Sequence, residues 1–187
     1  GTFAIDTDGT GVDAAFITAL LADTSADATV TVDATENGDA AYVAKLTNLS
    51  GSLSKIDDIT NLTLDIGQSD PEIANLLSKA TGAAVDATGL SSTAKGHIAD
   101  NITKIAADGV SSLTLTSSDT TDNITAILGT KTTDASVLVT ADGMDAQQLN
   151  AIAAEIDEID AAGTGISGTL ALTSSVTAGN ITALFGK

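Results

Sequence analysis

The sequence lacks several residue types that particular functions require. Among its 187 residues there is no cysteine, no tryptophan and no arginine, and histidine occurs once, at position 97. Without cysteine the chain forms neither a disulfide framework nor a thiolate metal site. Three phenylalanines and one tyrosine offer almost no rings on which nucleic acid bases could stack. Ala, Val, Ile and Leu supply nearly all of the apolar content, and small aliphatic side chains suit thin stacked layers better than one large globular centre.

Positive charge is also scarce. The chain has 25 acidic residues against 7 lysines, which gives a formal net charge of −18. Phosphate groups and anionic lipid surfaces would be repelled by this charge, so we expect no nucleic acid partner. No run approaches the roughly 18 apolar residues of a membrane span, and we expect no membrane insertion. The acidic residues are scattered among apolar ones, which argues against a disordered acidic tail.

Sets of residues that carry out catalysis are absent from the sequence as well. A Ser-His-Asp triad would need His97, and the chain contains no G-x-S-x-G elbow. It contains no phosphate-binding glycine motif, and carboxylates acting as glycosidase acids would lack aromatic platforms for sugar. We expect His97 to lie on a helix surface and predict that the protein is not an enzyme.

The sequence does contain a recurring five-residue segment. Residues 17–21 (ITALL) return as residues 124–128 (ITAIL) and again as residues 181–185 (ITALF). Each copy follows a short run in which apolar and other residues alternate, and related runs recur on average about every 28 residues, a spacing typical of structural repeats. We therefore predict one continuous array over residues 1–187, with repeats starting near residues 3, 30, 62, 83, 113, 137 and 170.

The alternating runs predict short strands, and an amphipathic helix is expected after each of them. The helix anchors are Ile17, Val43, Ile73, Ile98, Ile124, Leu149 and Ile181. Strands separated by helices must be parallel, and such crossovers are right-handed. The prediction is an α/β fold: a right-handed solenoid of about seven strand–turn–helix repeats, with one parallel sheet on one face and helices on the other.

Several helix ends can be placed by their capping residues. Residues 69–72 (SDPE) match a capping box with proline in the first turn, and residues 142–145 (DGMD) form a second plausible cap region. Gly82, Gly129 and Gly186 are expected to end helices in the left-handed conformation.

Two resemblances to known proteins follow from these patterns. Ile59-x-x-Leu62-x-Leu64 and its copy at residues 110–115 resemble the strand portion of leucine-rich repeats. Residues 113–128 (LTLTSSDTTDNITAIL) and 169–185 (TLALTSSVTAGNITALF) resemble the acidic Thr/Ala/Asp-rich repeats of large secreted bacterial surface proteins and adhesins, including some with nonapeptide calcium repeats. The resemblance implies an extracellular or cell-surface location and a structural or adhesive role.

A column of oxygen-bearing residues follows the predicted strands. Its members, one for each repeat, are Asp6, Asp33, Asp65, Asp86, Thr116, Thr140 and Thr173. The first loop places Asp6, Asp8 and Asp13 around glycines, a pattern of oxygen ligands that suits calcium. These three residues are the predicted metal ligands, and calcium is the only cofactor for which the sequence offers a site. The alternative is that each Asp caps a turn or the following helix.

Five N-x-S/T sequences allow two interpretations. They begin at Asn48, Asn61, Asn101, Asn123 and Asn180. In a eukaryotic secretory protein they would accept glycans, whereas the recurrent N-I-T also marks the start of the repeated helix, where Asn is a good cap residue.

The expected function is therefore that of a non-catalytic structural or adhesive segment of an extracellular surface, fibre or surface-layer protein. The alternative is a ligand-binding solenoid that recognises a protein or glycan on its strand face, although the outward strand residues are mostly Thr and Ala. The chain stops just after a repeated helix without an evident polar capping unit. We expect that open end to be covered by neighbouring repeats or by other copies of the chain, and we expect a cell surface or glycan as a further partner.

Overall fold

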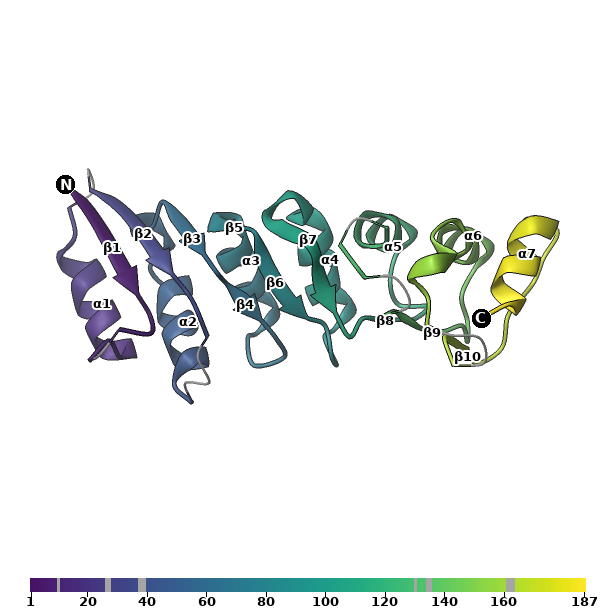
Figure 1. The fold of residues 1–187 in the computed structure, drawn as a ribbon, viewed down its shortest axis with the longest axis horizontal. Helices are drawn as coiled ribbons and strands as arrows, with labels where there is room; N and C mark the ends of the chain where they lie inside the picture. The colour runs from purple at the N-terminus through teal and green to yellow at the C-terminus, as the bar shows by residue number, and fades with distance from the viewer. Residues whose placement is uncertain (10, 26–27, 37–39, 130, 134–135, 161–163) are drawn as a thin grey trace.

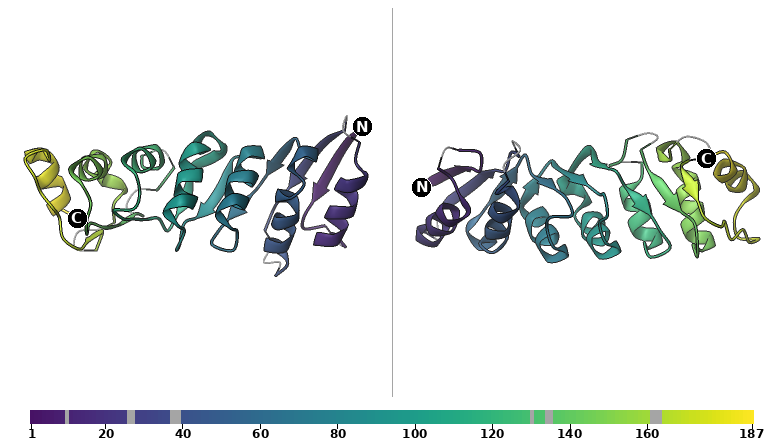
Figure 2. Two further views of the ribbon diagram at one scale, coloured as in Figure 1. Left: turned by 180° about the vertical axis from the view of Figure 1, so that it is seen from behind. Right: turned by 90° about the horizontal axis from the view of Figure 1, so that it is seen from below.

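The computed structural model describes residues 1–9, 11–25, 28–36, 40–129, 131–133, 136–160 and 164–187. Its elements follow one another in a row from the N-terminus to the C-terminus (Figure 1). The helices lie along one side of the row and the strands along the other, as Figure 2 shows from below. The described residues form seven α-helices: α1 (Ala14–Asp23), α2 (Tyr42–Ser50), α3 (Asp70–Lys79), α4 (Ser92–Asp100), α5 (Thr121–Ile127), α6 (Ala146–Ala154) and α7 (Ala178–Phe185).

The strands are short, and every strand pair in the described residues is parallel. They are β1 (Thr2–Asp6), β2 (Thr29–Asp33), β3 (Asp58–Thr60), β4 (Thr63–Leu64), β5 (Ala80–Thr81), β6 (Ala83–Asp86), β7 (Ile105–Ser111), β8 (Thr114–Leu115), β9 (Leu138–Thr140) and β10 (Ile166–Ser167). Short 3-10 helices follow α2, α4 and α6, at Leu53–Lys55, Ile102–Lys104 and Ile156–Glu158. The predicted α/β class with parallel strands is thus confirmed.

The prediction of one continuous sheet is wrong, because the strands form three sheets. Their strand orders are β1-β2-β3-β5, β4-β6-β7 and β10-β9-β8. Asn61, Gly82 and Ser112 have φ values of 53°, 66° and 55°, and each stands between two strand segments, β3 and β4, β5 and β6, or β7 and β8. A left-handed residue turns the backbone out of the extended conformation and interrupts the hydrogen-bond ladder. β3 and β5 then pair in the first sheet, β4 and β6 pair in the second sheet together with β7, and β8 belongs to the third.

The predicted seventh strand was misplaced. Residues 170–172 lie outside the strands, and Ile166–Ser167 forms β10 and pairs with β9 instead. Gly168, with φ of 83°, directly follows β10. By contrast, the repeat predicted to start near residue 83 does begin with a strand, the four-residue β6.

A helix begins in each of these two predicted cap regions. Ser69 and Glu72 form the capping box of α3 with proline in its first turn, and Asp145 forms a second capping box with Gln148 at α6. Two of the glycine predictions are wrong: Gly82 lies between strands, and Gly186 has right-handed backbone angles. Gly129 does adopt a left-handed φ of 74° shortly after α5.

One apolar cluster runs through the row from Ile5 to Leu184. Its helix contribution is regular: the fourth residue after each N-cap points inward. These residues are Ile17, Lys45, Ile73, Lys95, Ile124, Leu149 and Ile181. Val43 is therefore a wrong anchor for α2, since its side chain is 37% exposed, whereas Leu46 and Leu49 are buried. None of the described helices has the length and apolar character needed to cross a membrane.

Candidate functional site

The residue column that follows the strands lies along the edge where each strand turns toward its helix. Asp33 Oδ1 accepts the backbone N–H of Thr35 at 3.1 Å and its hydroxyl at 2.7 Å, and Asp86 binds Thr88 in the same way. Thr116 Oγ1 accepts a backbone N–H two residues further on, at 3.3 Å. These bonds are Asx- and ST-turns, and they support the turn-capping interpretation of the column.

The same bonds change the acidity of two carboxyl groups. Hydrogen bonds from Thr35 and Asn61 hold the pKa of Asp33 below its ordinary value, and those from Thr88 do the same for Asp86. Bonds to the ionised form favour that form. The turns are therefore strongest when these side chains are charged.

The predicted calcium ligands lie in the first of these turns. Asp6 Oδ1 accepts the backbone N–H of Asp8 at 2.9 Å. Asp13 is the N-cap of α1, where its Oδ1 accepts the N–H of Phe16 at 2.7 Å. In the described ranges, which omit residue 10, no group of three or more acidic or histidine side chains is arranged to hold a metal ion. Calcium at Asp6, Asp8 and Asp13 remains a prediction.

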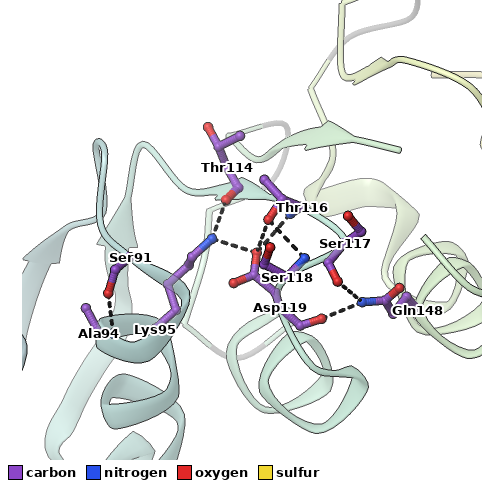
Figure 3. A network of polar contacts seen from close by, with 9 residues as sticks. All are labelled: Ser91, Ala94, Lys95, Thr114, Thr116, Ser117, Ser118, Asp119 and Gln148. Carbon is purple, nitrogen blue, oxygen red and sulfur yellow. Dashed lines mark hydrogen bonds and ion pairs between the residues drawn. The ribbon is translucent and has the colours of Figure 1, made fainter. Parts of the chain in front are cut away.

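The most elaborate polar arrangement in the described chain lies between α4 and α6 (Figure 3). Lys95, at the inward helix position of α4, places its Nζ 2.6 Å from Asp119 Oδ2. Its ammonium also donates to the carbonyl of Thr114 at 2.9 Å. Both side chains are almost completely buried, with 5% and 1% exposed. Removing two charges from water is costly unless they pair and bond well, and Lys95 meets that condition.

Asp119 accepts a hydrogen bond from the backbone as well as from Lys95. Its Oδ2 accepts the N–H of Thr116 at 2.8 Å, while its Oδ1 is buried and has no hydrogen-bond partner among the described residues. Gln68 occupies the matching place before α3, where its Oε1 accepts the N–H of Asp65 at 2.8 Å. The same role is therefore filled by a neutral amide in one repeat and by a carboxylate in another.

Gln148 extends the network into the next helix. Its Nε2 donates to the carbonyls of Asp119 at 2.5 Å and Ser117 at 3.2 Å. Its Oε1 accepts the N–H of Asp145. Side chains of α4 and α6 thus bind the turn before α5 from both sides. These bonds connect three consecutive repeats.

A hollow of about 410 Å³ opens beside this turn. It is lined by hydroxyl, carboxylate and amide groups, including those of Ser117, Ser118, Thr120, Thr121, Asp122 and Gln147. Such a lining can exchange hydrogen bonds with a hydroxylated ligand. His97 is not among its lining residues; it lies half-buried in α4, and its carbonyl accepts the side-chain amide of Asn101 at 2.9 Å.

Lysine is the functional residue type that sequence reasoning missed. Among the described residues, five of the seven lysines donate Nζ–H to a main-chain carbonyl 19 to 38 residues away: Lys45 to Thr7, Lys55 to Thr24, Lys95 to Thr114, Lys131 to Ile105 and Lys187 to Ile159. For Lys45 and Lys95 the available signal was the appearance of lysine at an inward helix position that elsewhere holds Ile or Leu.

Four of the sequon asparagines use their amide groups within the fold. Asn48 and Asn101 donate to main-chain carbonyls, Asn61 donates to Asp33 Oδ1, and Asn180 donates to Asn150 Oδ1. None of these bonds tests whether the sites carry glycans. The cap interpretation is wrong for Asn123 and Asn180, because the N-caps of α5 and α7 are Thr120 and Thr177, whose hydroxyls accept the backbone N–H groups of the two asparagines.

Comparison with known proteins finds no family model, no curated protein and no solved structure that matches this chain.

Proposed function

We propose that the chain is a structural segment of an extracellular surface, fibre or surface-layer protein, built as a right-handed, leucine-rich-repeat-like solenoid of about seven repeats. The observation that carries the proposal is the repeated junction between neighbouring helices. Each consecutive pair of α-helices, from α1·α2 to α6·α7, packs side by side, and lysine side chains tie one repeat to the backbone of another. In an array of this kind, stability comes from the repeats and from the junctions between them.

The mechanism of such a segment is mechanical. The apolar cluster runs the length of the row, so bending the row would separate packed side chains at every junction. The net charge of −18 keeps the lateral surface hydrated and repels other anionic surfaces. The segment would hold whatever it connects at a set distance, without catalysis and without inserting into a membrane.

Two measurements test this proposal. Small-angle X-ray scattering of the monomer should give the elongated profile of the row in Figure 1, and a compact profile would contradict it. An antibody raised against the chain should label intact cells of the organism that encodes it. Labelling only after lysis would overturn the extracellular location and leave the elongated architecture standing.

A ligand-binding module is the second candidate, and the polar hollow between α5 and α6 favours it. The hydroxyls of Ser118 and Thr121 line this hollow together with the Asp122 carboxylate, and such groups suit a glycan. The strand face offers a competing surface at Leu138, an exposed apolar residue of β9. A glycan array would separate the two: Asp122→Asn should abolish binding in the hollow, Leu138→Asp should abolish binding on the strand face, and absence of any bound glycan or protein would remove this candidate.

A further inference from the structure

One turn of the row carries a large apolar side chain where related turns carry serine. The turns at residues 65–69, 116–120 and 173–177 share one form, and each ends at the N-cap of a helix, α3, α5 or α7. Three residues before the N-cap, the later two turns have Ser117 and Ser174. The first turn has Ile66 there, which is 66% exposed. The form of the turn therefore does not require an apolar residue at this position.

The turn that carries Ile66 is held by its own hydrogen bonds. Asp65 Oδ1 accepts the N–H of Gly67 at 2.7 Å, and Gln68 Oε1 accepts the N–H of Asp65 at 2.8 Å. Gln68 is buried, so its side chain fixes the turn to the interior. Ile66 is thus presented to solvent by an ordered backbone. A backbone that is ordered before binding reduces the entropy lost when a partner covers the side chain.

Val43 of α2 extends this apolar surface into the preceding repeat. It is the second residue after the N-cap of α2 and is 37% exposed. A Cβ atom at Gly67 would lie 2.9 Å from Val43 Cγ2, so the Val43 side chain lies directly against the turn of Ile66. The other helices have smaller or more polar residues, or proline, at this position: Ala15, Pro71, Thr93, Asp122, Gln147 and Gly179.

Ile66 also reaches the repeat that follows it. A Cβ atom at Gly89 would lie 3.0 Å from Ile66 Cδ1. Glycine at positions 67 and 89 therefore leaves room for the side chains of Val43 and Ile66, which together form the apolar patch. Single apolar residues scattered on a surface need no explanation, whereas contiguous apolar surface rimmed by polar residues is typical of interaction sites.

The turns that adjoin the apolar patch are acidic. Their carboxylates are those of Asp65, Asp70, Glu72 and Asp86. None of the seven lysines lies in residues 65–72 or 86–91. Lys45 and Lys95, in the adjoining helices, are buried and donate to main-chain carbonyls. A ligand that complements this surface must therefore bring positive charge together with apolar groups.

We propose that the apolar patch binds a polypeptide segment in which basic residues alternate with apolar ones. Its apolar side chains cover Ile66 and Val43, and its cationic groups face the carboxylates of the adjoining turns. Complementary charge speeds the encounter and fixes orientation, while burial of Ile66 supplies affinity. A second copy of this chain does not fit, because its 25 acidic residues against 7 lysines would repel the same surface. The proposal adds a partner to the structural function and does not depend on the extracellular location.

Titration calorimetry of the complete chain with two synthetic peptides tests the proposal. A peptide in which lysine and leucine alternate should bind, and a peptide of equal charge in which lysine and serine alternate should bind about tenfold or more weakly. Ile66→Ser introduces the residue type found at the same turn position as Ser117, so the variant should fold. It should weaken binding of the lysine–leucine peptide by about tenfold or more. Far-UV circular dichroism would verify the fold.

Two further variants separate the apolar contact from charge. Leu138→Ser is the matched control, since Leu138 is 42% exposed in β9, further along the row (Figure 1), and this variant should bind like the parent chain. Asp65→Asn keeps an oxygen that can accept the Gly67 N–H and removes one charge. It should weaken binding at low ionic strength and match the parent at high ionic strength, because salt screens the charges. The loss caused by Ile66→Ser should persist in salt.

Three results would overturn the proposal. The lysine–leucine peptide does not bind, or it binds no better than the lysine–serine peptide, or Ile66→Ser binds it like the parent chain. The second and third results would show that the net charge alone attracts such peptides. Loss of binding in Leu138→Ser would likewise overturn the proposal, because it would place the peptide on the strand face. The scattering profile tests the structural function separately, since none of these results bears on the elongated shape.

Discussion

In the third and fifth repeats, the turn before the helix is held by different side chains at the same position. Before α3, the buried Gln68 accepts the N–H of Asp65, and before α5 the buried Asp119 accepts the N–H of Thr116. The difference follows from the neighbouring helix. Lys95 of α4 points forward to Asp119, whereas Lys45, at the same helix position of α2, points back to the carbonyl of Thr7. The turn residue is a carboxylate, Asp119, where the Lys95 ammonium reaches it. The charge of this buried turn residue is therefore matched to a side chain from another repeat.

The largest expected effect comes from breaking the charged version of this turn. Asp119→Ala should lower the free energy of unfolding by about 3–5 kcal/mol, because the Lys95 ammonium would be left buried without its carboxylate. Gln68→Ala should cost only about 1–3 kcal/mol, the loss of one neutral acceptor. Urea unfolding followed by circular dichroism measures both. Equal losses would show that the ion pair contributes nothing beyond the turn bond.

A double substitution should replace the charged version of the turn before α5 by a neutral one. Lys95→Ile with Asp119→Gln places an aliphatic residue where Ile73 stands in α3 and an amide where Gln68 stands. We expect stability to be unchanged or raised by up to about 4 kcal/mol, because a buried ion pair is often no better than apolar packing. Each single substitution is the control and should be destabilising. A double variant no more stable than Asp119→Gln alone would refute the matching of charge to lysine.

The boundary between the second and third repeats depends on a neutral side chain. Tyr42 Oη lies 2.8 Å from the Ala34 carbonyl oxygen and accepts the N–H of Thr63 at 3.1 Å, and burial raises the pKa of Tyr42 to about 12. Its neutral form is favoured by folding, so this contribution is complete below the unfolded pKa of about 10 and is lost as pH rises toward about 12. Tyr42→Phe should lower the free energy of unfolding by about 1–2 kcal/mol at neutral pH. In a plot of melting temperature against pH, this variant should show a flatter alkaline limb than the parent chain. An unaltered alkaline limb in that variant would contradict the assignment.

The half-buried turn carboxylates of Asp33 and Asp86 should have a smaller effect than the buried Asp119. Because the pKa values of Asp33 and Asp86 are lowered by folding, their contribution is present above the ordinary carboxyl pKa and is lost as pH falls through the folded value. Asp33→Asn with Asp86→Asn should therefore melt at a slightly lower temperature at neutral pH and lose less stability on acidification. A thermal melt series in acid measures this, and a parallel shift at all pH values would refute it.

The smallest effect is expected from removing divalent cations. The Asp6 and Asp13 oxygens already serve backbone amides, so a chelator should leave the melting temperature unchanged. A lowered melting temperature that calcium restores, and that Asp8→Asn abolishes, would establish the calcium site at the first turn.

Much of the fold could be predicted because its signals are local. Alternation at period two marked the positions of β1, β2 and β8, and Ser69 with Glu72 marked the start of α3. The division into three sheets could not be predicted in the same way. Asn61 and Ser112 adopt left-handed angles, although neither is glycine, and the residue types alone do not require that conformation.

The candidate site was less accessible to sequence reasoning than the fold. The aspartate column was recognised, and its turn-capping alternative agrees with the bonds of Asp33 and Asp86. The polar network of Lys95, Asp119 and Gln148 was not recognised. Its members lie 24 and 29 residues apart, on different repeats, so no short motif joins them.

The sequence alone determined the element types, the parallel direction of the strands, the main helix starts and the acidic character of the surface, because each depends on neighbouring residues or on composition. Tertiary structure decided where the sheet breaks and which carbonyl each of the five bonded lysines binds. Those features depend on side chains roughly one repeat apart. Whether a lysine at an inward helix position can be buried is settled only when the neighbouring repeat packs against it.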